Sequence, residues 1–441
     1  MKRLLSLLLC AVLALFCATT AQAAGVSITL TASEYALHYA FDAGAQDPFV
    51  ILEYATPAEK GWMMLYSEDG HFEGDVSLAY SGAGGKTSVA LTSARTTGSI
   101  GKASTTLPKA ADYQKPTGKS NAKVTDFVLT ETPEGFHYAF NAIGTDYMLL
   151  YWRSKEQTVT QPVYPDENGH YEGDVVSELT FARTQFTVQV KSGSGSMKKE
   201  ATVRKGYQAP EAPQRQEGRL SGVTVCIDAG HQENGRFVKE PIGPGLTGST
   251  SGKGGMAQGT KTNRRESIVC LEIGMLLRDE LLRQGANVIM TREDQTTFHT
   301  NIERCEIAEA GGAQIMLRLH CNNSSNHSKR GIQVYGPLNS DYAKAVADAD
   351  TYREMGQKLL DAMKTRVGMT LAKSTGMVRL NDNYVGNNWA KMMCFLVEMG
   401  YLSNPAEEYL LVTPVYQQWL AEGMADGVYE IAVARGWVQA Q

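Results

Sequence analysis

Two histidines and two glutamates carry the chemistry that this sequence could perform. His231 follows the run Val225–Gly230, and His320 ends an apolar run. Glu266 opens a segment with helical spacing, and Glu398 ends another apolar run. Two imidazoles and one carboxylate form an open catalytic zinc site, at which water becomes a hydroxide-like nucleophile near neutral pH. A second carboxylate beside such a site can transfer protons.

Spacing alone leaves structural roles open for each of these residues. A histidine at a strand end is often a hydrogen-bonded structural residue, and Glu266 could simply complement the dipole of the helix that it begins. Glu398 is harder to explain in this way, because an acid at the edge of an apolar strand is unfavourable unless it is paired or functional. The residue types are compatible with a Zn²⁺ site, and the structural alternative stays open at this point.

From Leu220 onward, strand-like and helical patterns alternate, as in a catalytic domain of the α/β class. The predicted strands are Val223–Asp228, Asn287–Arg292, Gln314–His320, Gly331–Tyr335 and Cys394–Glu398. The predicted helices are Glu266–Gln284, Ile302–Ala310, Asp341–Val367 and Pro405–Ala434. We expect a mixed, largely parallel sheet flanked by helices. Catalytic groups of open α/β sheets gather at the carboxyl ends of the strands, so the four residues should converge there.

Five motifs of this domain occur in the order that is typical of one enzyme family. They are Val225–His231, Glu266 at the start of a helix, Gly285–Arg292, Leu317–Asn322 and Phe395–Asn404. The segment from Leu220 to Ala434 therefore resembles the zinc-dependent N-acetylmuramoyl-L-alanine amidases of the amidase_3 type.

This resemblance implies a site, a cofactor and a substrate. By motif position, His231, Glu266 and His320 would bind Zn²⁺, and Glu398 would be the catalytic acid/base. The implied reaction is cleavage of the amide between N-acetylmuramic acid and the L-alanine of the peptidoglycan stem. Two motifs depart from the common pattern: Gln232–Asn234 replaces a glycine-rich run, and Leu-Arg-Leu precedes His320 where Ser-Ile is common. Neither departure removes a ligand.

The N-terminal half contains an internal repeat. His38–Phe41 recurs as His137–Phe140, and Gly70–Val76 recurs as Gly169–Val175, in both cases 99 residues later. Short runs rich in Val, Thr, Tyr and Phe alternate with turn signals in each copy. These features predict two tandem all-β, sandwich-like modules ahead of the catalytic domain.

The patterns divide the chain into five parts. We expect a signal peptide at 1–23, β module repeat 1 at 24–120, β module repeat 2 at 121–207, a linker at 208–219 and the zinc amidase catalytic domain at 220–441. The signal peptide consists of Lys2 and Arg3, an apolar run to Cys17 and small residues ending at Ala23. A polar stretch, Thr92–Ser120, closes the first module.

Charge and the predicted signal limit the partners of the protein. Loss of Lys2 and Arg3 with the signal takes the formal net charge from −5 to −7, so nothing indicates a nucleic acid or an anionic membrane surface. No later apolar run approaches the roughly 20 residues that span a bilayer, so we expect no membrane insertion after signal removal. We expect a secreted protein, extracellular or associated with the cell wall, that acts on peptidoglycan. The tandem modules are expected to bind a wall polymer.

Packing is the preferred explanation for most other notable side chains. Five cysteines follow the signal, all in apolar patterns, and their odd number favours buried thiols over disulfides. Aromatic residues of the modules could stack on sugar, but core packing is the better interpretation. These aromatic residues are Tyr35, Tyr39, Trp62, Tyr66, Tyr138, Tyr147, Tyr151 and Trp152.

A few polar residues near the motifs have weaker predicted roles. Glu240 is a less favoured candidate ligand in the loop Gln232–Arg265, which is rich in Gly and Pro and is expected to form a lid or a wall of the substrate site. Arg292 and Arg304 are expected to pair with sheet-end carboxylates or backbone. Asn322 is a candidate for orienting a ligand.

Two other functions remain open. A zinc exopeptidase of related architecture would share the sheet and the His/Glu ligands, but it usually adds acidic ligands for a second metal, which we do not find. A non-catalytic wall-binding protein with a decayed amidase domain would fit the tandem modules, but the four candidate residues are intact.

Overall fold

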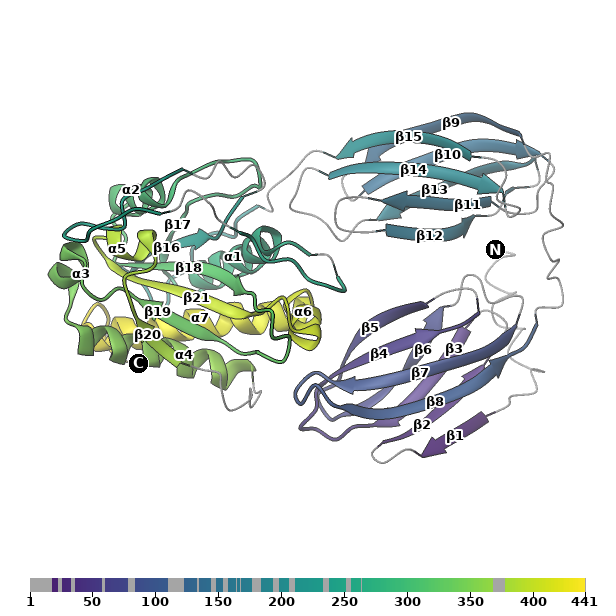
Figure 1. Cartoon of the computed structure of the whole chain (residues 1–441), viewed down its shortest axis with the longest axis horizontal. Coiled ribbons are helices and arrows are strands. Elements are labelled where there is room, and N and C mark those ends of the chain that lie inside the picture. The colour runs from purple at the N-terminus through teal and green to yellow at the C-terminus, as the bar shows by residue number, and fades with distance from the viewer. Residues whose placement is uncertain are drawn as a thin grey trace.

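The chain folds as two β-rich units followed by a domain of helices and strands (Figure 1). The computed structural model describes residues 18–22, 26–32, 36–57, 60–77, 84–109, 123–132, 135–143, 148–153, 158–163, 165–166, 168–176, 184–192, 198–205, 211–232, 238–250, 255–262, 264–367 and 377–440. Most of the predicted signal peptide lies outside these residues, as do Tyr35 and Tyr147.

The first unit has two sheets around one apolar core. Its strands are β1 (Ala18–Gln22), β2 (Ser27–Ala32), β3 (Ala36–Asp42), β4 (Phe49–Ala55), β5 (Lys60–Tyr66), β6 (His71–Ser77), β7 (Gly85–Ser93) and β8 (Ser99–Leu107). The sheet orders are β1-β2-β3-β6 and β5-β4-β7-β8. Alternate residues such as Ile28, Leu37 and Val89 are buried between the sheets, because side chains of a strand point to opposite faces in turn.

Two features of this unit differ from expectation. Strand β8 lies within the polar stretch Thr92–Ser120, so composition alone was wrong in suggesting a closing segment there. Its polar residues Ser99, Lys102, Ser104 and Thr106 are exposed, while Ala103, Thr105 and Leu107 are buried. Strand β1 pairs antiparallel with β2 although it belongs to the predicted signal peptide. Cleavage after Ala23, which stays a prediction, would remove this strand.

The second unit repeats the plan. Its strands are β9 (Lys123–Thr132), β10 (Gly135–Ile143), β11 (Met148–Arg153), β12 (Thr158–Val163), β13 (His170–Val176), β14 (Thr184–Ser192) and β15 (Lys198–Lys205), in sheets β13-β10-β9 and β12-β11-β14-β15. Phe41 stacks on Phe72 with ring centroids 4.9 Å apart, and Phe140 stacks on Tyr171 at 4.6 Å. Equivalent residues of the two sequence copies thus make equivalent core contacts.

The C-terminal domain is built on a six-stranded sheet. Its strands are β16 (Thr224–Ala229), β17 (Asn287–Met290), β18 (Ile315–Asn322), β19 (Gln333–Gly336), β20 (Met377–Leu380) and β21 (Met393–Tyr401), in the order β17-β16-β18-β21-β19-β20. Neighbouring strands are parallel except β19 and β21, which are antiparallel. The prediction of a mixed, largely parallel sheet is therefore confirmed.

Helices cover both faces of this sheet (Figure 1). They are α1 (Glu266–Arg283), α2 (Asn301–Ala310), α3 (Asp341–Val346), α4 (Ala349–Val367), α5 (Val385–Trp389), α6 (Pro405–Leu411) and α7 (Pro414–Ala434). The larger core joins α1, α4 and α7 to strand residues such as Ile227, Leu319 and Phe395. A smaller core on the other face joins α2 to the sheet through Cys226 and Cys305.

Element boundaries were the least predictable part of this domain. The patterns did not indicate β20 or α5, which are short and lack a long apolar period. The predicted helix Asp341–Val367 is two helices, and Pro405–Ala434 is divided before Pro414. Proline has no backbone N–H and disfavours helical geometry in the preceding residue, so a helix ends there and a new one begins.

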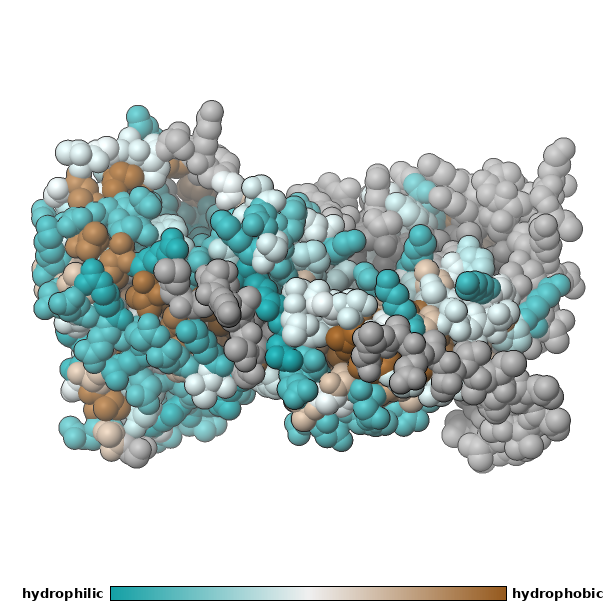
Figure 2. Space-filling view, turned by 60° about the horizontal axis from the view of Figure 1, so that its bottom comes forward, coloured by the Kyte–Doolittle hydropathy of each residue, from teal (hydrophilic) through white to brown (hydrophobic). Residues whose placement is uncertain are grey.

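The first β unit packs directly on the C-terminal domain. Phe49 belongs to the same apolar cluster as Tyr416 and Leu420 of α7, and Ile51 lies in a cluster with Tyr409 of α6. Figure 2 shows these two parts of the chain meeting along a border whose visible rim is mostly hydrophilic. The sequence patterns did not predict this contact.

Other expectations about packing are met. The five described cysteines are buried free thiols, as predicted. Tyr39, Tyr138 and Trp152 are buried in the cores of their own units, which confirms the packing interpretation for them. In the described part of the chain, no helix combines the length and apolar character needed to cross a membrane.

Candidate active site

The four candidate residues come together at one edge of the C-terminal sheet. His231 follows β16, His320 lies near the end of β18, and Glu398 lies in the second half of β21. These parallel strands run side by side, so their carboxyl ends share an edge. Glu266 reaches the same edge as the first residue of α1. The predicted convergence is confirmed.

The turn after β16 presents His231 in an unusual backbone conformation. His231 has φ 59°, in the left-handed region that side chains other than glycine rarely adopt. Such local strain is concentrated at functional sites. The preceding Gly230 makes room for the second histidine: a Cβ there would lie 2.4 Å from the Leu319 carbonyl oxygen and 2.6 Å from Cε1 of His320. Glycine is therefore required where β16 passes His320.

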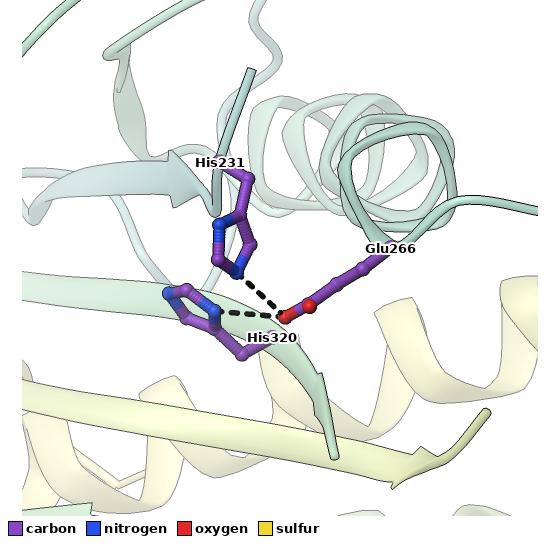
Figure 3. A group of neighbouring side chains, drawn as sticks. All are labelled: His231, Glu266 and His320. Atoms are coloured by element: carbon purple, nitrogen blue, oxygen red, sulfur yellow. Dashed lines mark hydrogen bonds and ion pairs between the residues drawn. The ribbon is translucent and has the colours of Figure 1, made fainter. Parts of the chain in front are cut away.

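The Glu266 carboxylate joins the two histidines (Figure 3). Its Oε1 lies 3.1 Å from Nε2 of His231 and 3.0 Å from Nδ1 of His320. Backbone N–H groups hold the carboxylate in place: Cys321 donates to Oε1 at 3.1 Å and Ala257 donates to Oε2 at 2.8 Å. Burial alone would raise the pKa of Glu266, but the hydrogen bonds and charges of the two histidines outweigh it and hold the pKa well below its usual range.

These three side chains fit a zinc ion. One ligand atom from each of His231, Glu266 and His320 lies within 4.8 Å of the others. Zinc bound tetrahedrally at ~2.0–2.2 Å would separate its ligand atoms by roughly 3.4 Å, close to the distances within this group. The donor set of two imidazoles and one carboxylate is one that zinc enzymes use. Burial also lowers the pKa of His320, which favours the neutral imidazole that a metal requires.

Glu398 lies beside this group, on the neighbouring strand. It pairs in register with His320 across β18 and β21, so both side chains project from the same face of the sheet. Its Oε2 is buried and has no hydrogen-bond partner among the described residues. Burial, with the charge of Glu266 as a second cause, raises the pKa of Glu398 to about 8. A carboxyl group in this state can both accept and donate a proton near neutral pH.

A buried ionic network supports the histidine-bearing strands. Asp228 is fully buried, bonds to Arg304, and accepts from Nε of Arg318 at 2.9 Å. Burial would raise the pKa of Asp228, but the two arginines outweigh it and hold the pKa well below its usual range. Arg304 also donates to the backbone carbonyl of His231 at 3.1 Å. The network thus fixes the turn that carries the first histidine.

The arginines named in the sequence behave as predicted, and one was missed. Arg292 donates to the carbonyl oxygens of Ala229 and Gly230, at 2.7 and 2.8 Å. Pairing of Arg292 and Arg304 with sheet-end groups is therefore confirmed. Arg318 was not assigned a role, although a charged residue inside the run Leu317–Leu319 was a signal of a buried ion pair.

A cavity of about 440 Å³ opens over the four residues. Gly255, Met256 and Ala257 form part of its lining, so the prediction that the loop Gln232–Arg265 supplies a wall is confirmed for this part. Asn322, Asn323, Asn383 and Tyr384 line other parts of the cavity. Amide and phenol groups offer both donors and acceptors to a bound molecule.

Several polar residues lie outside the group of ligands. Glu240 accepts from the Ile302 backbone N–H at 2.9 Å at the start of α2, which agrees with its lower rank as a candidate ligand. Asn322 donates to Gln333 at 3.0 Å and does not orient a histidine. Nδ1 of His327 lies 2.7 Å from the Ser403 carbonyl, away from the cavity.

Comparison with known proteins shows that this domain is similar to amidases. Residues 225–430 match the Amidase_3 family model, described as N-acetylmuramoyl-L-alanine amidase. The germination-specific N-acetylmuramoyl-L-alanine amidase of Bacillus subtilis is 25% identical over 230 residues, covering 49% of this chain and 83% of that protein. The probable cell wall amidase LytH of Staphylococcus aureus is 26% identical over 218 residues, covering 48% of this chain and 60% of LytH.

A solved structure is also similar. The N-acetylmuramoyl-L-alanine amidase from Clostridium difficile 630 is 23% identical, with a TM-score of 0.38, and the match covers 48% of this chain and 96% of that chain. The segment that matches the family model, residues 225–430, contains His231, Glu266, His320 and Glu398. The C-terminal domain of this chain is therefore similar, over residues 225–430, to the Amidase_3 family of N-acetylmuramoyl-L-alanine amidases.

Proposed function

We propose that this protein is a zinc-dependent N-acetylmuramoyl-L-alanine amidase that hydrolyses the amide between N-acetylmuramic acid and L-alanine in peptidoglycan. The observation that carries the proposal is the approach of His231 and His320 to one carboxylate oxygen of Glu266, with Glu398 on the adjoining strand. The match to the Amidase_3 family model and the names of the similar proteins support the same reaction.

In this proposal, His231, Glu266 and His320 hold the metal. Bound zinc supplies Lewis-acid polarisation of the scissile carbonyl and makes a water molecule more acidic. The backbone N–H groups of Cys321 and Ala257 fix both oxygens of Glu266, so the carboxylate stays in position when substrate enters. Such supporting contacts raise the precision of a metal site.

Glu398 is the proposed proton carrier. It accepts a proton from the attacking water and then donates it to the nitrogen of L-alanine, because an amine leaves readily only when it is protonated. Its unpaired Oε2 and its raised pKa, about 8, both suit a group that changes protonation during each turnover. Nearby Asn322 and Asn383 offer hydrogen bonds to the amide groups of a peptide stem.

Secretion is the second part of the proposal. The predicted signal at 1–23 would deliver the protein to the compartment that contains peptidoglycan. We also propose that the β modules contribute to binding the wall, since they precede the enzyme domain and are repeated. Five cysteines that are buried and unpaired in the described structure would be shielded from oxidation there.

The test is digestion of purified peptidoglycan by the zinc-loaded chain from residue 24 onward, followed by mass analysis of the released ends. The proposal expects free amino groups on L-alanine and intact N-acetylmuramic acid. Release of single amino acids from the stem would instead favour the exopeptidase alternative. No released product, with the wall still bound, would favour the decayed wall-binding protein. His320→Ala serves as the inactive control.

A further inference from the structure

Strand β4 of the first β unit is buried on both faces. Val50 and Leu52 point into the core of their own unit and are fully buried. Phe49 and Ile51 point to the other face, where they are 1% and 3% exposed. A strand of an isolated sandwich has one solvated face, so the outer face of β4 requires a partner. The partner is the C-terminal domain, because Phe49 and Ile51 cluster with its residues.

Aromatic side chains form the contact, which we call the aromatic seam. It consists of Phe49, Trp62 and Tyr66 from the first unit and of Tyr409, Tyr416 and Trp419 from α6 and α7. Ring centroids are 5.1 Å apart for Phe49 and Trp419, and 5.6 Å apart for Tyr66 and Trp419, with edge-to-face geometry in both pairs. Trp62 and Tyr409 are 4.1 Å apart. Aromatic pairs of this kind stabilise an interface beyond the area that they cover.

Helix α6 connects the seam to the active site. Ala406 and Tyr409, one turn apart, face the first unit. On other sides of the helix, Glu407 accepts from the Tyr401 backbone N–H at 2.7 Å, at the end of the strand that carries Glu398. Glu408 accepts from the Lys261 backbone N–H at 2.9 Å. Helix α6 therefore contacts both the first unit, at the aromatic seam, and the segments that form the cavity.

The segment 255–262 completes the connection. Its residues Gly255, Met256 and Ala257 line the cavity, and the Ala257 N–H donates to Glu266. Lys261 lies in the same segment, a few residues after Ala257, and its backbone N–H donates to Glu408 of α6. A displacement of α6 would thus move the wall of the cavity and one of the two N–H groups that fix the Glu266 carboxylate.

We infer that the first β unit is a structural part of the catalytic unit, which fixes α6 through the aromatic seam and so positions the cavity wall at 255–262. The second unit differs, because its core cluster, as far as the structure describes it, contains residues of that unit alone. Seam residues are positioning residues and not catalytic residues. The activity measurements that test this inference rest on the proposed function, whereas the hydrogen-exchange measurements do not.

The test uses the full mature chain with Trp62→Ala and Tyr409→Ala, alone and combined. Trp62 is 38% exposed, so its loss leaves the core of the first unit intact. We expect amide hydrogen exchange at Lys261 to accelerate about tenfold, because an aromatic pair contributes energy equivalent to roughly that factor. We also expect kcat/KM on a soluble muramoyl-peptide to fall several-fold, with the double variant no worse than either single variant. Tyr409→Phe keeps the ring and should restore both properties.

Phe186→Ala is the matched control. Phe186 is fully buried in the core of the second unit, so this change removes a similar ring from a unit that the inference leaves out. Exchange at Lys261 and kcat/KM should then stay at wild-type values. Unchanged exchange at Lys261 in both Trp62→Ala and Tyr409→Ala would overturn the inference. Inactive wild-type protein would contradict the proposed function instead, while the exchange measurements would still decide the role of the seam.

Discussion

His320 and Glu398 are direct register partners on the parallel strands β18 and β21. Neighbouring strands are about 4.8 Å apart, and partners on them project from the same face. The separation of a proposed metal ligand and the proposed proton carrier is therefore set by backbone hydrogen bonds of the sheet. Glu266 is the only one of the four candidate residues that a helix supplies.

Removal of His320 tests the metal site. We expect the purified mature chain to hold about one zinc per molecule and His320→Ala to lose both the zinc and the activity, since two remaining ligands bind the ion weakly. Elemental analysis with circular dichroism distinguishes metal loss from unfolding. His327→Ala is the control, because His327 lies away from the cavity and should be dispensable. An active preparation without zinc would contradict this prediction, and two tightly held zinc ions would favour the exopeptidase.

The Glu398→Gln variant tests proton transfer. The amide keeps the shape of the side chain but cannot carry the proton, so we expect zinc to be retained and kcat to fall on the order of 10²–10⁴-fold. Steady-state kinetics on a soluble muramoyl-peptide and zinc analysis of the same sample give the answer. Glu309→Gln, a change of the same type at an exposed pair with Lys391, should leave kcat unaltered. Normal turnover in zinc-loaded Glu398→Gln would rule out the role.

Asp228→Asn tests the buried ionic network. The substitution leaves Arg304 and Arg318 buried without their shared counter-charge, which destabilises a protein by about 3–5 kcal/mol. Urea unfolding monitored by circular dichroism measures the change. Because Arg304 also holds the His231 carbonyl, zinc affinity should fall at temperatures where the variant is still folded. A variant as stable as wild type would show that the network is not needed.

The raised pKa of Glu407 predicts that the stability of the folded protein depends on pH. Burial raises its pKa from 4.5 to about 7, despite hydrogen bonds from the N–H groups of Tyr401 and Gly331 and the nearby charge of Arg330. The folded protein therefore binds a proton that the unfolded chain releases above about pH 4.5. This contribution is fully present below that pH and is lost as the pH rises through 7, by on the order of 3 kcal/mol.

Comparison of wild type with Glu407→Gln isolates this effect. The urea midpoint of wild type should fall between pH 5 and pH 8 by more than that of the variant, because glutamine does not titrate. Glu422→Gln, at a partly exposed ion pair with Arg366, should keep the wild-type pH dependence. Parallel curves for wild type and Glu407→Gln would contradict the prediction.

Much of the site could be predicted from the sequence because of how parallel sheets are built. His231, His320 and Glu398 each lie near the carboxyl end of a predicted strand, and such ends must share an edge once the strands are adjacent. The strands themselves were visible as apolar runs between helical periods. Glu266 needed the family motif as well, since a carboxylate at a helix start has an ordinary structural explanation.

The contacts between parts of the chain were harder to predict. The run Phe49–Leu52 has four consecutive apolar residues, which is typical of a strand buried on both faces. The sequence does not specify what covers the second face, because helix α7 is far away in the chain and its apolar residues are also explained by its own domain. The role of Glu240 was open for a related reason: only the fold shows that it meets the start of α2.

The aromatic seam also defines the place of the second β unit in the topology of the chain. Phe49 and Trp419 are 370 positions apart, and their contact closes a loop that contains the whole second unit. In topological terms, that unit is an insertion within a single packed body. During synthesis this contact cannot form before α7 has been made. The aromatic face of the first unit therefore stays uncovered until nearly all of the printed sequence has been synthesised.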